Sequence, residues 1–309
     1  MGDTQACCGP PDGLWRGAPE PGTVPSRMPE LPELEALVRA MDEPVAASAV
    51  ARPPEAHFAV LKTADPPLSS LAGKRLTGAL RRGKYLLFPV DDGTTLAVHL
   101  MSGGRIGYAA PGERKPGNAV LSVPFEDGGA LVVTEAGRRK NVRVHLLREA
   151  GLGDLLAGLG PEPLEPEFDR AALDAVLDAR PRQLNSLLRD QRAVAGIGRA
   201  FADEILHAAR LSPFAISARL DPEARDGLYD AIRAVLGAAM LACAKQGTRL
   251  PAKNDARPLQ VHGHDGDPCP RCGATLRFVD FESNRIVYCP PCQTAGRELA
   301  DRRLSKLLR

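Results

Sequence analysis

The sequence predicts an α+β multidomain protein with a β-sandwich and flanking helix, a helical domain and a small β-hairpin module, in that order. Three observations predict it. Short apolar segments separated by tight turns occupy the first half, helical repeats of apolar residues begin after residue 151, and four cysteines in two pairs lie near the C-terminus. The 309 residues suffice for two domains and a small module.

The composition is that of an ordinary soluble globular protein. Hydrophobic residues make up 44% of the chain and charged residues 25%. No run reaches the roughly 18 consecutive apolar residues of a membrane span, and the first 27 residues lack the apolar core of a secretion signal. We therefore expect a cytoplasmic protein without a membrane partner.

Charge is balanced over the whole chain but not along it. The 40 basic and 38 acidic residues give a net charge of +2, which does not suggest a nucleic-acid binder. Residues 245–309 alone carry 12 basic and 7 acidic side chains, a net charge of +5. A basic C-terminal part fits a surface that faces phosphate, and it fits a solvated face with a basic tail equally well.

Residues 1–27 stand apart from the rest. They include CCGPPDG and APEPGTVP, are rich in proline and glycine, and show no helical or strand period. Such a segment is disordered, or it is an upstream extension of the gene model that the cell never translates. Met28 then reads as the start of the protein, because Pro29, Glu30 and a helix follow it directly.

Residues 28–150 are predicted to form the β-sandwich and its helix. The helix is expected over 32–43, where Pro32 suits the first helical position and Pro44 ends the helix. Its apolar stripe consists of Leu34, Leu37, Val38 and Met41. Short apolar segments with turns such as DDGT and EDGG between them predict the strands of a sandwich or barrel. These segments are 85–90, 95–100, 119–125, 130–134 and 142–147.

Residues 151–245 are predicted to form a helical domain, with 246–262 as a linker behind it. Asp169 and Asp221 are expected to cap two of its helices. In GIGRAF the glycines permit a tight turn before a helix, whose first N–H groups could hold a phosphate, although such turns are usually only structural. Cys243 lies in an apolar helical pattern and is expected to be a small buried hydrophobe.

The two C-x2-C pairs are separated by 16 residues, which is typical of a zinc ribbon. Between them, LRFVDFE and RIVYC read as two strands joined near Ser283 and Asn284. Because cysteine fills all four positions and leaves none open, one structural zinc is expected, and a redox role for either pair is the weaker alternative. The ribbon is assigned to 263–295 and a basic tail to 296–309. The predicted ligands are Cys269, Cys272, Cys289 and Cys292.

Two basic clusters flank the predicted strands. They are Arg81, Arg82 and Lys84 before the first strand, and Arg138, Arg139 and Lys140 at the end of a later one. Both clusters could be solvated faces. Together they also form a plausible wall facing DNA, because basic side chains on a sheet edge suit a phosphate backbone.

Pro29 and Glu30 carry a possible reaction. A prolyl nitrogen inside a chain is an amide without a nucleophilic lone pair, but at a free N-terminus it is a secondary amine. An α-amine has a pKa of about 7.7–8.0, so part of it is neutral at physiological pH and can attack a sugar C1′ to form an iminium. The adjacent carboxyl of Glu30 can move the protons that this requires. The plainer reading of these two residues is an N-terminal helix cap.

These segments together resemble a known family. MPELPELEAL, RRGKYLL, GPEPL, LLRDQRAVAGIGRAFADEIL and the four-cysteine ribbon occur in the order found in the formamidopyrimidine-DNA glycosylase and endonuclease VIII family of base-excision repair. The resemblance covers about residues 28–295. Two further segments, DEILHAARLSPF and QTAGRELADRRLSKLL, resemble an actinobacterial branch of that family.

The resemblance implies an activity and a set of roles. Met28 is removed, Pro29 attacks C1′ of the damaged nucleotide, and Glu30 is the general acid. Lys84 assists the β- and δ-eliminations that nick the strand, and Arg285 on the hairpin grips phosphate. A helix–two-turn–helix domain clamps damaged double-stranded DNA, from which the base is flipped. The DNA-binding residues implied are Arg138, Arg139, Lys140 and Arg199, in a monomer with one zinc.

Three departures from the family pattern leave the lesion open. Arg199 stands where the family usually has asparagine, and Asn185 stands where related chains often have lysine. No aromatic residue follows the arginines at 138–139, although many members have a phenylalanine there. A catalytically impaired DNA-binding relative is therefore the alternative function. A zinc-ribbon protein acting on RNA would explain the ribbon and the tail but not MPELPE.

Overall fold

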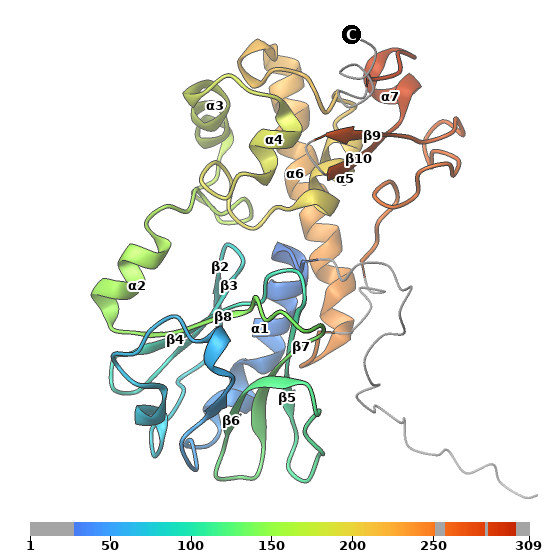
Figure 1. Cartoon of the computed structure of the whole chain (residues 1–309). Helices are drawn as coiled ribbons and strands as arrows, with labels where there is room; N and C mark the ends of the chain where they lie inside the picture. Colours follow the sequence, from blue (N-terminus) through green and yellow to red (C-terminus); the bar gives the residue numbers. More distant parts are fainter. Residues whose placement is uncertain (1–27, 251–256, 282–283, 301–309) are drawn as a thin grey trace, which may run out of the picture.

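The computed structural model describes residues 28–250, 257–281 and 284–300. The predicted N-terminal extension, part of the predicted linker, Ser283 and most of the predicted tail lie outside these residues. A β layer forms one end of the molecule, and the helical domain lies at the other with the hairpin module beside it (Figure 1). Helices α1 and α6 are in contact and connect the two ends.

Helix α1 (Leu31–Ala46) begins with a capping box. Glu30 is the N-cap, and its N–H donates to the carboxylate of Glu33 at 3.3 Å. The prediction that Pro44 ends the helix is wrong, because the helix continues to Ala46. So close to the end, proline removes only one hydrogen bond of the last turn, which the helix tolerates. The predicted apolar stripe is buried: Leu34, Leu37, Val38 and Met41.

Two four-stranded antiparallel sheets form the predicted sandwich. One has the order β2-β3-β4-β8 and the other β1-β6-β7-β5. All five predicted segments are strands. The unpredicted strands are very short or, in β5, interrupted by glycines that dilute the apolar pattern. The bounds are β1 Glu55–Ala56, β2 Leu80–Arg82, β3 Tyr85–Pro89, β4 Thr95–His99, β5 Gly104–Ala109, β6 Ala119–Pro124, β7 Ala130–Glu135 and β8 Arg143–Leu147.

Helices α3 to α6 form the helical domain, and α2 connects it to β8 of the sandwich. As predicted, Asp169 and Asp221 cap α3 and α6 by accepting the N–H groups of Ala172 and Ala224, each at 2.8 Å. Cys243 is fully buried, as expected. The bounds are α2 Glu149–Leu156, α3 Arg170–Ala179, α4 Leu184–Arg189, α5 Arg199–Ala208 and α6 Pro222–Cys243, with 3₁₀ turns at Phe58–Val60, Leu68–Leu71, Ser217–Arg219 and Ala244–Gln246.

Helix α6 with its following turn, Pro222–Gln246, is long and apolar enough to cross a membrane by length and composition alone. It is nevertheless the central helix of this domain, because one face packs into the domain core and contacts α1 and α5. Its first turns carry charge, and Arg225 there pairs with Asp174 and Asp178 of α3. These features are those of an amphipathic core helix. The residues of its buried face are Leu228, Ile232, Leu236 and Ala239.

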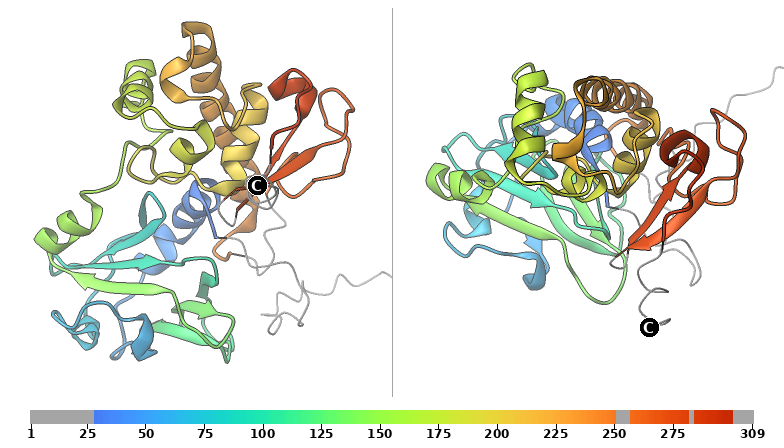
Figure 2. Two further views of the ribbon diagram at one scale, coloured as in Figure 1. Left: turned by 45° about the horizontal axis from the view of Figure 1, so that its top comes forward. Right: turned by 90° about the horizontal axis from the view of Figure 1, so that it is seen from above.

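The hairpin module consists of β9 (Arg277–Phe281), β10 (Asn284–Tyr288) and the short helix α7 (Pro290–Thr294), which confirms the predicted ribbon. It lies against α5, as Figure 1 and the two views of Figure 2 show. Two buried carboxylates of α5 hold it there. Glu204 accepts the N–H groups at 260–262 at 2.8–3.1 Å, and Asp203 accepts the N–H of Val287 at 3.2 Å.

Candidate active site and metal centre

The segment Pro29–Glu30 lies between the sandwich and the helical domain. The Glu30 carboxylate is buried and accepts three main-chain N–H groups at the start of α5. The donors are Gly198 at 2.6 Å, Ala200 at 3.0 Å and Phe201 at 3.3 Å. The helix N-terminus therefore stabilises a carboxylate of the chain itself, through its N–H groups and its dipole. Of the two readings of GIGRAF, the structural one is favoured, because these N–H groups bind Glu30 and not a phosphate.

The two glycines of GIG are required by this contact. Gly198 lies so close to Glu30 that an added Cβ would stand 2.5 Å and 2.7 Å from the two carboxylate oxygens. Gly196 has a φ of +88°, and an added Cβ would stand 2.8 Å from Leu31 Cβ. The N–H of Leu31 also donates to the carbonyl of Gly196 at 3.0 Å. Both glycines thus allow the helical domain to touch the segment that carries Pro29 and Glu30.

Lys84 lies in the same pocket as Glu30. It is buried, in the turn between β2 and β3, and its charge interacts with Glu30, Glu33, Arg189 and Arg257. Burial lowers the pKa of the Lys84 ammonium, and the two arginines lower it further, while the carboxylates oppose the shift. A lysine with a lowered pKa gives up its proton more readily than an exposed one, as a general base requires.

Arg81 and Arg82 do not form the expected DNA-facing wall or a solvated face. Arg81 pairs with Glu35 at 2.9 Å and with Glu162 at 2.7 Å, and Arg82 pairs with Glu162 at 2.8 Å. The N–H of Gly83 donates to the same Glu162 at 2.6 Å. Glu162 belongs to GPEPL and lies about 80 positions away along the chain, so no local pattern could reveal the pairing. These contacts fix the turn that carries Lys84.

Three charged residues of the pocket were missed by the sequence prediction: Glu33, Arg105 and Arg257. Arg257 Nε donates to Glu33, and Arg257 Nη2 donates to the carbonyl of Met28 at 2.8 Å. Burial raises the pKa of Glu33 to about 7 although Arg257 opposes the shift. Burial, and then Arg257, lowers the pKa of Arg105 to about 10. The spacing of Glu30 and Glu33 is a capping-box signal, whereas Arg257 lies in an aperiodic segment without any signal.

Asn185 is buried and does not face an open pocket. Its Nδ2 donates to Asp203 at 3.3 Å, and its Oδ1 accepts from Arg189 Nη1 at 3.2 Å. Asp203 also contacts His262 Nδ1 at 2.7 Å. Asn185 therefore belongs to a buried network that joins α4, α5 and the ribbon, and it holds Arg189, whose charge is felt at Lys84.

Arg285 lies on β10 of the hairpin module. Its guanidinium pairs with Asp265 at 3.2 Å and Asp280 at 3.7 Å and lies 3.9 Å from the ring centroid of Phe278. The side chain is about half exposed. Among the described residues, no hydrogen bond or ion pair joins Arg285 to Pro29, so its predicted role stays a prediction.

The remaining predicted DNA-binding residues lie at the surface. Arg138 and Arg139 are exposed in the loop between β7 and β8, and Arg199 is exposed at the first position of α5. Lys140 differs, because its ammonium donates to the carbonyls of Glu135 at 2.9 Å and Gly137 at 2.8 Å. It shapes the loop that presents the two arginines.

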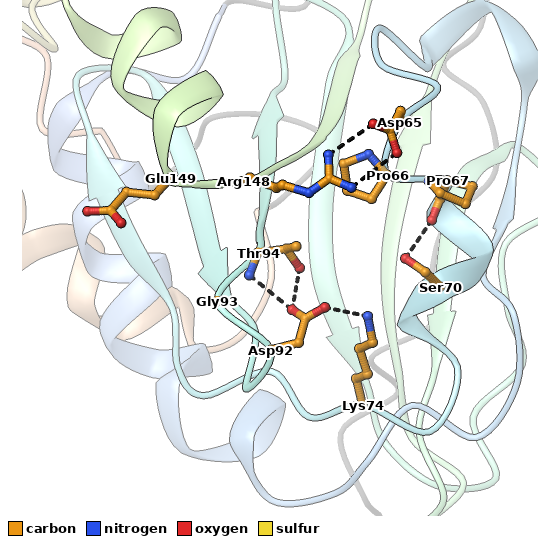
Figure 3. A pocket seen from close by; sticks show the side chains of 10 residues that line it. All are labelled: Asp65, Pro66, Pro67, Ser70, Lys74, Asp92, Gly93, Thr94, Arg148 and Glu149. Atoms are coloured by element: carbon orange, nitrogen blue, oxygen red, sulfur yellow. Dashed lines mark hydrogen bonds and ion pairs between the residues drawn. The ribbon is translucent and has the colours of Figure 1, made fainter.

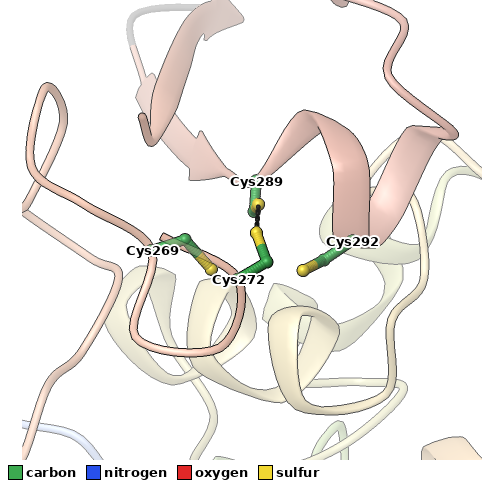
Figure 4. Close-up of side chains that lie close together, drawn as sticks. All are labelled: Cys269, Cys272, Cys289 and Cys292. Atoms are coloured by element: carbon green, nitrogen blue, oxygen red, sulfur yellow. Dashed lines mark hydrogen bonds between the residues drawn. The ribbon is translucent and has the colours of Figure 1, made fainter. Parts of the chain in front are cut away.

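The four predicted zinc ligands come together at the base of the ribbon (Figure 4). Their sulfurs all lie within 4.8 Å of one another, and Cys272 Sγ is 3.5 Å from Cys289 Sγ. Four sulfurs about 2.3 Å from a tetrahedral zinc are about 3.8 Å apart, so the cluster fits the ion and leaves no open position. The cluster is that of a structural zinc site. His207 of α5 lies 3.2 Å from Cys269 Sγ and connects the cluster to the helical domain.

A surface hollow of about 520 Å³ lies on the sandwich, away from all the predicted site residues (Figure 3). Both of its cations are paired, Lys74 with Asp92 and Arg148 with Asp65. Its charges therefore compensate each other, and the hollow offers no convergent group for a ligand.

Comparisons with known proteins agree with the predicted resemblance. The model of the formamidopyrimidine-DNA glycosylase N-terminal domain matches residues 28–142, and that of the formamidopyrimidine-DNA glycosylase H2TH domain matches 159–251. The chain is 33% identical over 276 residues to formamidopyrimidine-DNA glycosylase of Chloroflexus aurantiacus, covering 86% of this chain and 98% of the relative. It is 37% identical over 268 residues to that of Moorella thermoacetica, covering 82% and 94%.

Solved structures of DNA complexes have the same fold. MutM in complex with DNA containing carbocyclic 8-oxo-G matches with a TM-score of 0.76 and 27% identity over 86% of this chain and 100% of that one. Lactococcus lactis Fpg in complex with DNA containing an abasic site matches with the same TM-score and identity, over 86% and 99%. This chain belongs to the formamidopyrimidine-DNA glycosylase family of base-excision repair.

Proposed function

We propose that the protein is a bifunctional DNA glycosylase and AP lyase that acts on damaged double-stranded DNA through the amine of Pro29. The observation that carries the proposal is the fixed position of Pro29–Glu30 against α5, with Lys84 buried in the same pocket. The relatives whose structures contain 8-oxo-G analogue or abasic-site DNA support DNA as the partner.

The reaction requires a free N-terminus at Pro29. In the printed chain this nitrogen is an amide, so translation from Met28 and removal of Met28 must expose the secondary amine. The N-terminal family model begins at residue 28, which supports this start. The segment 1–27 lies outside the described residues, and a chain that retains it would bind DNA without lyase chemistry.

The chemistry follows from the pocket. Pro29 N attacks C1′, the bond from C1′ to the base breaks, and the base leaves with the electron pair and takes up the proton released by the amine. Glu30 protonates O4′ as the ring opens to the iminium. Lys84 takes a proton from C2′ as the bond to the 3′ phosphate breaks, and δ-elimination then releases the 5′ phosphate. Water hydrolyses the iminium and restores the amine.

Basic residues outside the pocket would hold the DNA backbone. Arg138, Arg139 and Arg199 are exposed and suited to phosphate contacts. Arg285 would have to exchange Asp265 and Asp280 for a phosphate, and Phe278 beneath its guanidinium supports that surface. The ribbon that carries Arg285 is held in shape by zinc, which supplies structure and no reaction step.

Two finer assignments belong to this proposal. An uncharacterised formamidopyrimidine-DNA glycosylase-like protein of Mycobacterium tuberculosis is 40% identical over 151 residues, covering 49% of this chain and 94% of that relative, which supports an actinobacterial-type branch. The relatives are DNA-repair enzymes, which supports action in the cytoplasm on the chromosome, and we propose that the protein acts there as a monomer. The alternative is a DNA-binding relative without turnover, to which the pairing of Arg285 with Asp265 and Asp280 in place of a phosphate would also be suited.

Borohydride trapping tests the proposal. The protein started at Met28 is incubated with duplex DNA containing an abasic site, and the reduced adduct is measured by mass spectrometry. We expect one covalent adduct per chain, lost in a protein that retains residues 1–27, whose Pro29 nitrogen is an amide. Binding to a tetrahydrofuran abasic analogue is measured in parallel. Normal binding without any adduct in the processed protein would establish the DNA-binding alternative.

A further inference from the structure

Arg257 has an unusual position for a charged side chain. Its side chain is only 1% exposed, and Nε is held by Glu33. Nη2 donates to the carbonyl of Met28 at 2.8 Å. Nη1 is buried, lies 3.8 Å from Glu30 Oε1, and makes no hydrogen bond to the described part of the chain.

Burying such a donor without a hydrogen bond is costly, and native proteins keep few of them. The ion pair with Glu33 needs only Nε, so this pair does not explain the terminal nitrogens. Phe201, whose ring centroid lies 5.9 Å from the guanidinium carbon, supports the flat face of the group but satisfies neither nitrogen. Within the described residues, Nη1 therefore has only the distant ion pair with Glu30 and no hydrogen bond, and Nη2 has only the Met28 carbonyl.

This end of Arg257 lies beside the reactive nitrogen. The Met28 carbonyl that accepts from Nη2 is bonded directly to Pro29 N. Because a peptide C=O bond is about 1.23 Å and the C–N bond about 1.33 Å long, Nη2 lies within about 5 Å of Pro29 N. Removal of Met28 also removes this acceptor. In the processed protein Nη2 then lacks this acceptor, and it lies beside Nη1, which already makes no hydrogen bond to the described residues.

The charges around that space favour an anion. The cations that interact there are Lys84, Arg105, Arg189 and Arg257, against the carboxyls of Glu30 and Glu33. Glu30 is already engaged with α5, and Glu33 with Arg257 Nε. A guanidinium whose two terminal nitrogens point the same way binds two oxygens of a phosphate at once, which an ammonium cannot do.

We propose that the terminal nitrogens of Arg257 bind a phosphate of the damaged nucleotide once Met28 is removed, and so place C1′ against Pro29. This proposal rests on the function proposed above. It adds a DNA-binding residue from a segment that the sequence analysis assigned to a linker. It also gives removal of Met28 a second consequence, because the same cleavage that frees the amine frees the phosphate site.

Binding to a chemically modified duplex tests it. The duplex carries a tetrahydrofuran abasic analogue, which cannot form an iminium, so binding does not depend on the reactivity of Pro29. The phosphate on its 5′ or 3′ side is replaced by an uncharged methylphosphonate. We expect one of the two replacements to weaken binding by the processed protein about 10- to 100-fold, the value of a charged hydrogen-bonded contact.

The variants separate the role of Arg257 from its place in the fold. Arg257→Met leaves the buried Glu33 carboxyl unpaired, so it is compared with Arg257→Met/Glu33→Gln, which removes both charges together. We expect the double variant to fold, to bind the unmodified duplex about 10- to 100-fold more weakly, and to be insensitive to the same methylphosphonate. Arg257→Lys keeps the positive charge but lacks the two terminal nitrogens of the guanidinium. It should show a sensitivity to the methylphosphonate between those of the native protein and the double variant.

A matched control comes from the chain itself. A protein that retains residues 1–28 keeps the Met28 carbonyl on Nη2, and we expect it to lose the methylphosphonate sensitivity as well. The proposal is overturned if neither methylphosphonate weakens binding by the processed protein. It is also overturned if the folded double variant loses as much affinity on methylphosphonate replacement as the native protein does. A positive borohydride adduct together with that result would leave the glycosylase proposal intact.

Discussion

Helix α5 holds two different parts of the enzyme, and it holds them by different means. Its first turn binds Glu30 through main-chain N–H groups that the fold always supplies. Its middle binds the ribbon through Asp203, Glu204 and His207. The ribbon, however, has a core of only a few residues around the four sulfurs and depends on a metal for its own shape.

The difference separates the catalytic pocket from the surface that carries Arg285. The pocket of Glu30 and Lys84 lies between two extensive hydrophobic cores and should persist without any cofactor. The Arg285 surface should exist only while zinc is bound. In the function proposed above, the chemistry at C1′ and the phosphate contact of Arg285 thus depend on parts of the molecule with very different stabilities, a separation that three experiments can sharpen or break.

Zinc removal should have the largest effect. Structural zinc contributes about 10–16 kcal/mol in small ribbon-like peptides, so a chelator should unfold the ribbon. We expect hydrogen exchange to accelerate strongly in residues 277–288 while residues 198–203 at the start of α5 stay protected. Readdition of zinc should restore the protection. Equal loss of protection in both segments would show that the pocket depends on the metal as well.

Gly198→Ala should come next, because it acts on the other contact of α5. The added methyl group would stand 2.5–2.7 Å from the Glu30 oxygens and must displace the carboxylate. Overpacking of this kind costs about 1–3 kcal/mol, and a displacement of about 1 Å at a catalytic group can cost about 100-fold in rate. Urea unfolding and the rate of borohydride trapping measure the two effects.

The matched control is Gly237→Ala in α6, where an added Cβ meets nothing within 4 Å. Because alanine suits a helix interior better than glycine, this change should leave trapping unaffected and stabilise the protein by up to about 1 kcal/mol. If Gly198→Ala traps abasic DNA as fast as this control, the contact between Glu30 and α5 is not needed for the reaction.

Local patterns predicted the elements of this molecule well. Asp169 and Asp221 cap helices because a cap depends only on the next few residues, and the cysteine spacing specifies the ribbon for the same reason. The contacts that build the pocket were not predictable in this way. Glu30 and Gly198 are 168 positions apart, and such pairs carry no shared periodicity. Arg257 lies in an aperiodic stretch that resembles a linker.

The same limit explains the basic clusters. Arg81–Arg82 and Arg138–Arg139 look alike as sequence, yet the first pair is neutralised by a distant carboxylate and the second is exposed. Composition determines how many charged residues a chain has. The tertiary fold determines which of them pair with an opposite charge from a distant segment. Only the folded arrangement could show that Glu162 comes back to the RRGK turn.

Glu33→Gln should have the smallest effect on the reaction. It tests whether the stability of the pocket depends on pH. Burial raises the pKa of Glu33 from 4.5 to about 7 in the folded protein. Between these two pH values the folded state binds more protons than the unfolded state. The stabilising contribution of Glu33 is therefore complete below pH 4.5 and is lost as the pH rises through 7, by at most about 3 kcal/mol.

Glutamine keeps an oxygen for Arg257 Nε but does not titrate. The difference in unfolding free energy between native protein and Glu33→Gln should therefore move in favour of the variant from pH 5 to pH 7 and then stay constant. Urea unfolding at pH 5, 6, 7 and 8 measures it, and subtraction cancels the pH dependence of the zinc cluster, which both proteins share. A constant difference would mean that the ion pair with Arg257 keeps Glu33 charged throughout. The stability of the pocket would then depend neither on pH in this range nor on zinc, whereas the structure of the ribbon depends on its metal.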